Sequence, residues 1–217
     1  MMEPFRPNLV GNFQKSFEQL SWQMLHEGYL LMLGAAWNKT GWEEEKLTAH
    51  YISYMKESDI FRKHPVSIDP EPRIYNYNHT HGSKVPKSAP RIDIQFTWAS
   101  KNPFLVETKV LFEQKRKQGV GVVKKTIDNH KRYIETGIEH FLSGHYPLPG
   151  CLVGYLVECD TGQIVSSIKN IIVVNGFSPR VGNIEQEATP IYPELYFSTN
   201  QSSTGQEIHL RHFMLKL

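Results

Sequence analysis

The sequence predicts an α/β domain in which helices flank a central mixed β-sheet. Apolar residues recur at helical spacing in two segments near the N-terminus. Residues 91–98 and 104–111 then have the patterns of two strands joined by a turn. Further apolar strand patterns follow a later helix. This mixture of a hairpin and strands separated by helices is typical of a mixed sheet.

Length and composition are those of one globular domain. The 217 residues suffice for a sizeable core, and the apolar and charged fractions, 40% and 21%, are ordinary. A net charge of +2 does not by itself indicate a nucleic-acid-binding protein. Two cysteines make no disulfide framework, and the apolar run 29–37 is too short to cross a bilayer, so we expect a cytoplasmic protein without a membrane segment.

The N-terminal third is predicted to be helical. Residues 1–11 are expected to form an arm, and the first helix to run from Phe13 to about Gly34 within a helical segment 12–38. A second helix is expected after Gly41, because carboxylates in its first turn suit the helix dipole. Those carboxylates are Glu43, Glu44 and Glu45, and the apolar face that follows is Leu47, Tyr51, Ile52 and Met55.

The remaining chain supplies the strands. A short strand is expected at 73–77, then the strand 91–98, whose even positions from Ile92 to Trp98 are apolar and would share one face. Residues 104–111 read as a buried strand, followed by a basic segment and a helix ending near Tyr146. The last elements are a strand at 151–157, a helix from 164, and a hairpin of 195–199 with 208–215. We therefore expect one domain, 1–217, with its core at about 40–160 and C-terminal strands at 190–217.

A polar cluster is predicted on the central hairpin. Side chains two apart share a strand face, so Glu107 and Lys109 point together, and the hairpin brings Asp93 opposite one or the other. Facing side chains lie ~5 Å apart at Cβ, which lets two carboxylates share a divalent cation. Mg²⁺ suits such hard oxygen ligands, and a bound Mg²⁺ with a neighbouring lysine is what phosphodiester hydrolysis requires.

The tripeptide by itself is weak evidence. Acid-x-Lys occurs three times, at Glu44, Glu107 and Glu113 with the lysine two residues on, but only the middle copy lies in an apolar strand. The alternative is a surface ion pair on a half-exposed sheet, and the apolar residues around Glu107 argue against it.

The hairpin with Asp93, then Glu107-Thr108-Lys109, resembles the core of the PD-(D/E)XK nuclease superfamily, which has a restriction-endonuclease-like fold. Ile92 stands where the family name has proline. The resemblance implies that Asp93, Glu107 and the carbonyl of Thr108 bind Mg²⁺, with Mn²⁺ able to substitute, and that Lys109 is the catalytic lysine. It also implies an active-site glutamate on the preceding helix, which fits Glu44 best and Glu45 next.

The chain after the second strand is basic and could contact a phosphate backbone. Residues 111–132 carry a net charge of +5, seven basic side chains against two acidic ones. The expected nucleic-acid contacts are Lys115, Arg116, Lys117, Lys124 and Lys125. A solvated helix face is the alternative. In the superfamily the helix that follows often adds a side chain to the site, and His130 and Tyr133 are the candidates here, although a structural role is favoured for each.

The expected activity is that of a Mg²⁺-dependent endonuclease cutting DNA, in a bacterial or phage restriction or antiviral-defence context. No sequence-reading domain is evident, so specificity would come from loops, a homodimer or a partner protein. The alternatives are a repair or recombination nuclease, an RNase, or a non-catalytic nucleic-acid-binding module on the same fold.

Overall fold

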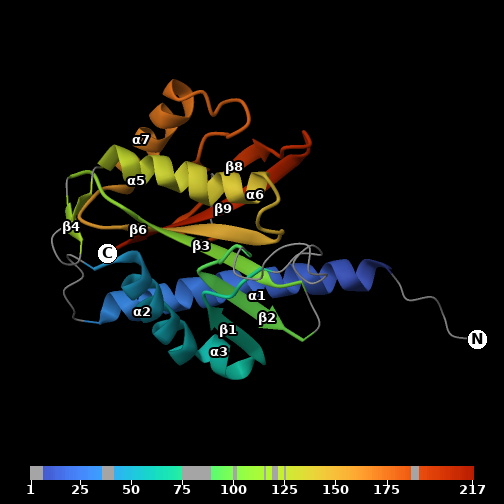
Figure 1. Cartoon of the computed structure of the whole chain (residues 1–217). Helices are drawn as coiled ribbons and strands as arrows, with labels where there is room; N and C mark the ends of the chain where they lie inside the picture. Colours follow the sequence, from blue (N-terminus) through green and yellow to red (C-terminus); the bar gives the residue numbers. More distant parts are fainter. Residues whose placement is uncertain are drawn as a thin grey trace, which may run out of the picture.

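A computed structural model describes residues 7–35, 42–74, 89–99, 102–114, 116–118, 122–124, 126–186 and 191–217, with side chains described outside 7–13, 116–118 and 122–124. The chain forms an α/β structure in which helices cover both faces of an open, mixed, seven-stranded sheet (Figure 1). The predicted α/β class and the predicted mixed sheet are therefore confirmed.

The sheet has the strand order β1-β2-β3-β6-β9-β8-β7. Its centre, β3-β6-β9, is parallel, and the remaining neighbours pair antiparallel. The strands are β1 (Val66–Pro70), β2 (Ile94–Trp98), β3 (Phe104–Leu111), β6 (Gly150–Leu156), β7 (Glu185–Gln186), β8 (Leu195–Gln201) and β9 (Glu207–Lys216).

Two layers of helix enclose this sheet. On one face lie α1 (Pro7–Gly34), α2 (Glu44–Glu57) and α3 (Asp59–Lys63). On the other lie α7 (Thr161–Val174) and a continuous helical segment made of α5 (Thr126–Arg132), the π-helix η2 (Tyr133–Ile138) and α6 (Glu139–Leu142) (Figure 1).

Strand β3 separates two hydrophobic cores. Phe104, Val106 and Val110 pack into the core beneath α1 and α2, whereas Leu105 and Leu111 pack into the core beneath α5 to α7. Every residue of β3 is buried, which explains why its sequence is a continuous apolar run rather than an alternating one. The charged pair Glu107 and Lys109 interrupts that run in the middle of the molecule.

Several predicted elements differ in detail. Residues 7–11, expected in an arm, belong to α1, and strand β1 was not predicted. The expected strand at 73–77 is represented by a single bridge, Arg73 to Arg91, and residues 75–77 lie outside the described residues. The helix expected after the basic segment was predicted to end near Tyr146, and it ends at Leu142.

The strand predicted at 91–98 was wrong at its start. The chain bends at Asp93, and β2 begins at Ile94. Ile92 therefore packs beneath α5 to α7 while Ile94 and Phe96 pack beneath α1 and α2, so these residues do not share one face. An alternating sequence cannot reveal such a bend, because its apolar positions are the same before and after the chain turns.

The basic segment is also partly a strand pair. Two short strands, β4 (Arg116–Gln118) and β5 (Val122–Lys124), form a separate antiparallel ribbon before α5. Within the described part of the chain, no helix combines the length and apolar character needed to cross a membrane.

Candidate active site

The candidate site lies where β2 separates from β3. Their ladder ends at the pair Ile94–Val106, while β3 continues to Leu111 beside β6. Beyond Val106, side chains replace β2 as hydrogen-bond partners for the backbone of β3. Buried backbone N–H and C=O groups need hydrogen-bond partners, so polar side chains are required at fixed positions along this edge of β3.

Asp93 supplies the first of these partners. One of its carboxylate oxygens, Oδ2, accepts hydrogen bonds from the Thr108 backbone N–H at 2.6 Å and from the Thr108 hydroxyl at 2.9 Å. The register of Ile94 opposite Val106 places Asp93 at the level of Glu107, which resolves the two registers that the sequence left open. Because the chain bends at Asp93, this residue leaves the β2 ladder and its carboxylate caps the backbone of the neighbouring strand β3.

Glu44 supplies the second hydrogen-bond partner for the backbone of β3. It is the first residue of α2, and its Oε2 accepts from the Val110 N–H at 3.2 Å. Its Oε1 lies 3.7 Å from Lys109 Nζ. Glu43 and Glu45 are both exposed; Glu45 lies at the rim of the site, and of the three glutamates it is Glu44 that contacts the core of the cluster.

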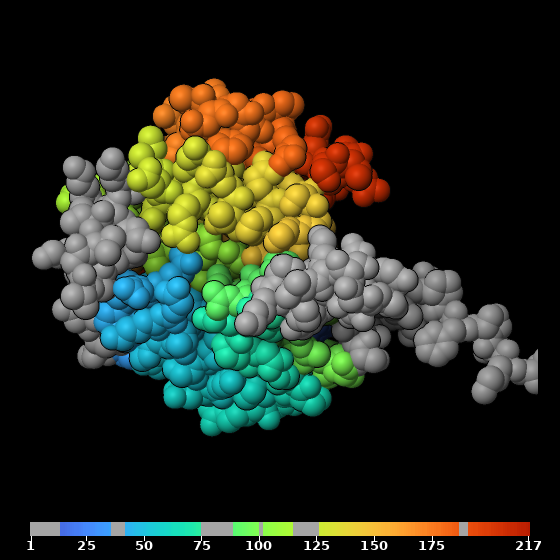
Figure 2. Space-filling model, in the orientation of Figure 1, coloured from blue at the N-terminus to red at the C-terminus, as the bar shows by residue number. Residues whose placement is uncertain are grey.

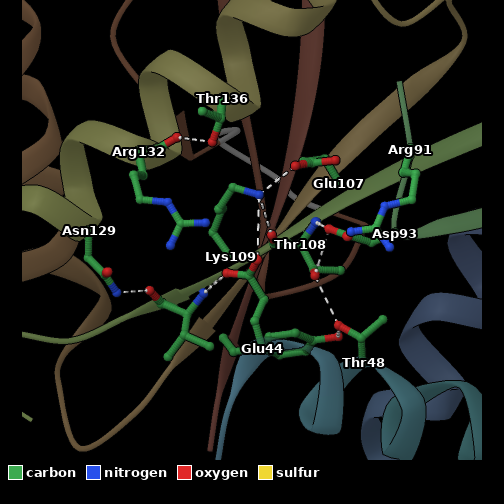
Figure 3. Close-up of polar contacts among 12 residues, drawn as sticks. Glu44, Thr48, Arg91, Asp93, Glu107, Thr108, Lys109, Asn129, Arg132 and Thr136 are labelled. Atoms are coloured by element: carbon green, nitrogen blue, oxygen red, sulfur yellow. Dashed lines mark hydrogen bonds and ion pairs between the residues drawn. The ribbon is translucent and has the colours of Figure 1, made fainter. Parts of the chain in front are cut away.

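Glu107 and Lys109 form a buried pair at the centre. Their exposed fractions are 5% and 4%. Lys109 Nζ donates to Glu107 Oε1 at 2.5 Å and to the Thr108 carbonyl at 2.8 Å (Figure 3). The second Glu107 oxygen, Oε2, is buried and makes no hydrogen bond of good geometry; the nearby Tyr146 hydroxyl, which interacts with the Glu107 carboxylate, donates to the Arg91 carbonyl instead. A buried carboxylate oxygen without a partner is costly, and it marks a place where a ligand would restore the balance.

The pKa values reflect this crowding. Burial raises the pKa of Glu107, Lys109 lowers it and Asp93 raises it, with a net value of about 7. Burial and Asp93 also raise the pKa of Glu44 against the opposing effect of Lys109. Burial by itself would lower the pKa of Lys109, but the surrounding carboxylates outweigh it and the pKa is raised. Lys109 is therefore a cation, not a general base, near neutral pH.

An open cavity of about 360 Å³ exposes this cluster to solvent. In the space-filling view it corresponds to the hollow between α2 and the yellow helical segment of α5 to α6 (Figure 2). Its floor holds Asp93, Glu107 and Lys109, and Glu44 lies on the α2 side. The cavity thus joins residues separated by more than sixty positions in the chain.

The far wall of the cavity was not predicted from sequence. Arg132 and Thr136 reach the site from the helical segment opposite α2 (Figure 3), and His140 follows one turn later. The pKa of His140 is lowered to about 4 by burial, by His145 and by Lys109, and its Nδ1 is buried without a hydrogen-bond partner. The spacing of four between these residues was the available signal, because residues four apart share a helix face.

Tyr146 and Arg91 complete the rim. The Tyr146 hydroxyl donates to the Arg91 carbonyl at 2.7 Å, and burial together with the nearby Glu107 carboxylate raises the Tyr146 pKa. Tyr146 is at the same time part of the hydrophobic core beneath α5 to α7, so it lines the site from a buried position. It lies after the helix, in a segment whose path depends on tertiary packing.

The two accessory candidates lie elsewhere. His130 is buried with Nε2 4.0 Å from Glu113, and the Tyr133 hydroxyl lies 2.8 Å from His212 Nδ1 in the core. Neither lines the site cavity. Asn129, one residue before His130, instead donates to the Val110 carbonyl at 2.5 Å and so caps the same strand edge.

The predicted phosphate contacts are only partly described. Arg116, Lys117 and Lys124 lie on the β4–β5 ribbon, where the backbone alone is described, and Lys115 and Lys125 fall outside the described residues.

A metal would find hard oxygen donors at the site. Among the described residues, no group of three or more His, Cys, Asp or Glu side chains is placed to hold an ion. Asp93, Glu107 and the Thr108 carbonyl nevertheless offer two carboxylates and a carbonyl, and Mg²⁺ commonly uses one or two carboxylates with the rest of its shell as water. The partnerless Glu107 Oε2 fits that need.

No family model, no curated protein and no solved structure matches the chain. The functional assignment consequently rests on the geometry and chemistry of the site.

Proposed function

We propose that the protein is a Mg²⁺-dependent nuclease that hydrolyses phosphodiester bonds of DNA. The observation that carries this proposal is the joint placement of Asp93, Glu107 and the buried Lys109 at the open edge of β3, within a solvent-accessible cavity. A buried ion pair with a partnerless oxygen destabilises a fold, so it indicates a ligand-binding role. The resemblance of this hairpin to the PD-(D/E)XK core, with a restriction-endonuclease-like fold, supports the same reading.

Asp93, Glu107 and the Thr108 carbonyl would hold the metal, and Mn²⁺ would substitute for Mg²⁺. When bound, the metal supplies charge neutralisation and lowers the pKa of water. Lys109 Nζ contacts both Glu107 and the Thr108 carbonyl, the same two groups assigned to the ion. Lys109 is therefore expected to turn toward the substrate when those groups are engaged.

The side chains of the chain have distinct roles in this proposal. Protonated Lys109 donates a hydrogen bond to the phosphoryl oxygen that gains charge, or orients the attacking water. Glu44 holds Lys109 on its other side and keeps the ammonium near the cavity. Arg132 and Arg91, on opposite sides of the rim, are positioned to hold the phosphates of the substrate backbone.

The biological setting follows by analogy. Small free-standing members of the superfamily act in restriction and in antiviral defence of bacteria or in phages, and we propose such a context here. One site cuts one strand, so cleavage of both strands of a duplex would require a homodimer or a partner protein, which would also supply sequence specificity.

The test uses purified full-length chain and three near-isosteric variants, Asp93→Asn, Glu107→Gln and Lys109→Met. Plasmid, single-stranded, branched DNA and RNA are incubated with Mg²⁺, Mn²⁺ or EDTA. We expect metal-dependent cleavage of DNA by the wild type and a loss of about a hundredfold or more in each variant. Circular dichroism checks that the variants are folded. Full activity in all three variants, or in EDTA, would overturn the site.

A further inference from the structure

A second cavity adjoins the proposed active site. It has a volume of about 290 Å³ and shares Glu44, Glu45, Glu71 and Asp93 with the active-site cavity. Its remaining lining residues are Thr48, Ala49, Ile52 and Pro70. The two cavities therefore meet at the carboxylates between α2 and the start of β2.

The two cavities differ in charge. Both cavities contain the carboxylates of Glu44, Glu45, Glu71 and Asp93. Arg91, Lys109 and Arg132 also line the active-site cavity, where Glu107 adds a fifth carboxylate and Arg91 pairs with Glu71, whereas the described residues lining the second cavity include no lysine, arginine or histidine. The wall of the second cavity is instead apolar, formed by Ala49, Ile52 and Pro70. A nucleotide has a comparable division, since its phosphate is charged and its base is a flat, uncharged ring with apolar faces and a polar edge.

We infer that the second cavity receives the base of the nucleotide whose phosphate lies in the active-site cavity. This inference rests on the proposed nuclease function. Among the described residues of the second cavity no cation offsets these carboxylates, so this cavity disfavours a phosphate, yet carboxylates accept hydrogen bonds from the amino groups of bases, as acidic side chains do when they read cytosine. Base and phosphate thus have separate places on either side of Asp93.

The inference determines the substrate class. A base inside a duplex is stacked and paired, so it reaches a protein cavity only by leaving the stack, at a cost that is smallest for a strand that is already unpaired. The enzyme is therefore selective for unpaired nucleotides, as in a single strand, a flap or a frayed end, over an intact duplex.

One variant addresses the cavity without touching the catalytic cluster. Ala49 is exposed on α2, and Ala49→Leu fills the second cavity while keeping a good helix former. The matched control is Ser166→Leu, at an exposed position of α7 in the opposite helical layer. Both variants add one leucine to a helix surface.

The experiment measures Mg²⁺-dependent cleavage of three substrates with one labelled strand in common. These are the single strand, its blunt duplex, and single strands in which one abasic nucleotide is moved stepwise along the chain. We expect wild type and Ser166→Leu to cut the single strand at least tenfold faster than the duplex. We also expect an abasic nucleotide to lower cleavage at one adjacent bond by about tenfold. Ala49→Leu should cut the intact single strand about as slowly as the abasic one.

The outcomes separate this inference from the proposed function. Equal cleavage of duplex and single strand, or no effect of any abasic nucleotide, overturns the base-binding role while leaving the nuclease assignment standing. An unchanged rate for folded Ala49→Leu overturns it as well. No cleavage of any substrate overturns the nuclease assignment, and the base-binding role with it.

Discussion

At the scale of single residues, the three carboxylates of the site have opposite effects on the fold. Asp93 and Glu44 accept hydrogen bonds from the backbone of β3, so each completes the sheet. Glu107 instead keeps one oxygen buried and partnerless. Removing the first two leaves an amide unpaired, whereas removing the charge of Glu107 relieves a cost.

The raised pKa of Glu107 predicts a pH dependence of stability. The folded state holds the Glu107 proton up to a pKa of about 7, whereas an unfolded chain releases it near the ordinary glutamate pKa of 4.5. Between these values the folded state binds more protons, so the free energy of unfolding falls as pH rises through this window. In EDTA, we expect wild type to lose on the order of 3 kcal/mol more than Glu107→Gln across the window. Urea unfolding at several pH values measures this, and parallel curves for the two proteins would contradict it.

Glu44 is predicted to matter more than its neighbours. Glu44→Ala removes the contact with Lys109 and the bond to the Val110 N–H, while Glu43 is exposed and makes no side-chain capping bond. We expect Glu44→Ala to slow cleavage by about tenfold or more and Glu43→Ala to leave the rate within about twofold. Single-turnover kinetics with excess enzyme compare the two. The reverse order would place α2 in another register at the site.

The sequence predicted the central residues well and the rim poorly, for a physical reason. Glu107 and Lys109 lie two residues apart on β3, and the register of the β2–β3 hairpin brings Asp93, one residue before β2, to the level of Glu107. Arg132 and Tyr146 reach the cavity through a helix orientation and a later loop. The helix orientation and the path of the loop depend on packing between segments distant in the chain, and a single sequence does not reveal that packing.

At the scale of elements, the π-helix η2 contributes side chains both to the hydrophobic core and to the active-site cavity. Tyr133, its first residue, faces the core and bonds His212, which also lies 2.8 Å from Ser198. Thr136 and His140 face the cavity. In an α-helix residues four apart diverge by about 40°, and the wider π turn reduces that drift. His130 and Tyr133 were proposed from the family resemblance, by residue type, and not from the helix face that lines the cavity.

Helix packing positions α2 and therefore Glu44. A Cβ atom at Gly28 of α1 would lie 2.4 Å from Met55 Cγ and 3.1 Å from its Cα. Gly28→Ala is therefore expected to destabilise the fold by about 1–3 kcal/mol, although alanine is the better helix former. It should also slow cleavage, because α2 must move outward.

Gly34→Ala on the same helix is the control, since a Cβ there has open space around it. Thermal or urea unfolding of both variants makes the comparison. If Gly28→Ala proved as stable as Gly34→Ala, the close approach of α1 and α2 would be wrong.

At the scale of the whole molecule, the sheet order could not be predicted. The strands β3, β6 and β9 are parallel neighbours, but each is separated from the next by a long crossover, so sequence order does not give spatial order. The hairpins β2–β3 and β8–β9 were predicted because their partners are adjacent in sequence. The strand β1 was missed because a proline ends it and only five residues form it.

The basic ribbon should govern long-range attraction of nucleic acid. Replacing Lys115, Arg116 and Lys117 with glutamine is expected to weaken binding and to reduce the slope of log K against log salt by about 2 to 3. Fluorescence anisotropy in EDTA at several salt concentrations measures this slope. The matched control replaces with glutamine three lysines on helices α2, α3 and α7, namely Lys56, Lys63 and Lys169. An unchanged slope in the ribbon variant would favour the solvated-face alternative.

The open edge of β3 has a consequence for how this protein tolerates change. Enzymes often become more stable when an active-site charge is removed, because strain was retained for activity. Here that rule should hold for Glu107 and fail for Asp93 and Glu44, whose carboxylates replace a missing strand. A substitution of Asp93 that abolishes activity would also destabilise the fold, unless asparagine retained the hydrogen-bond acceptor. An inactive descendant would therefore be expected to lose Glu107 first.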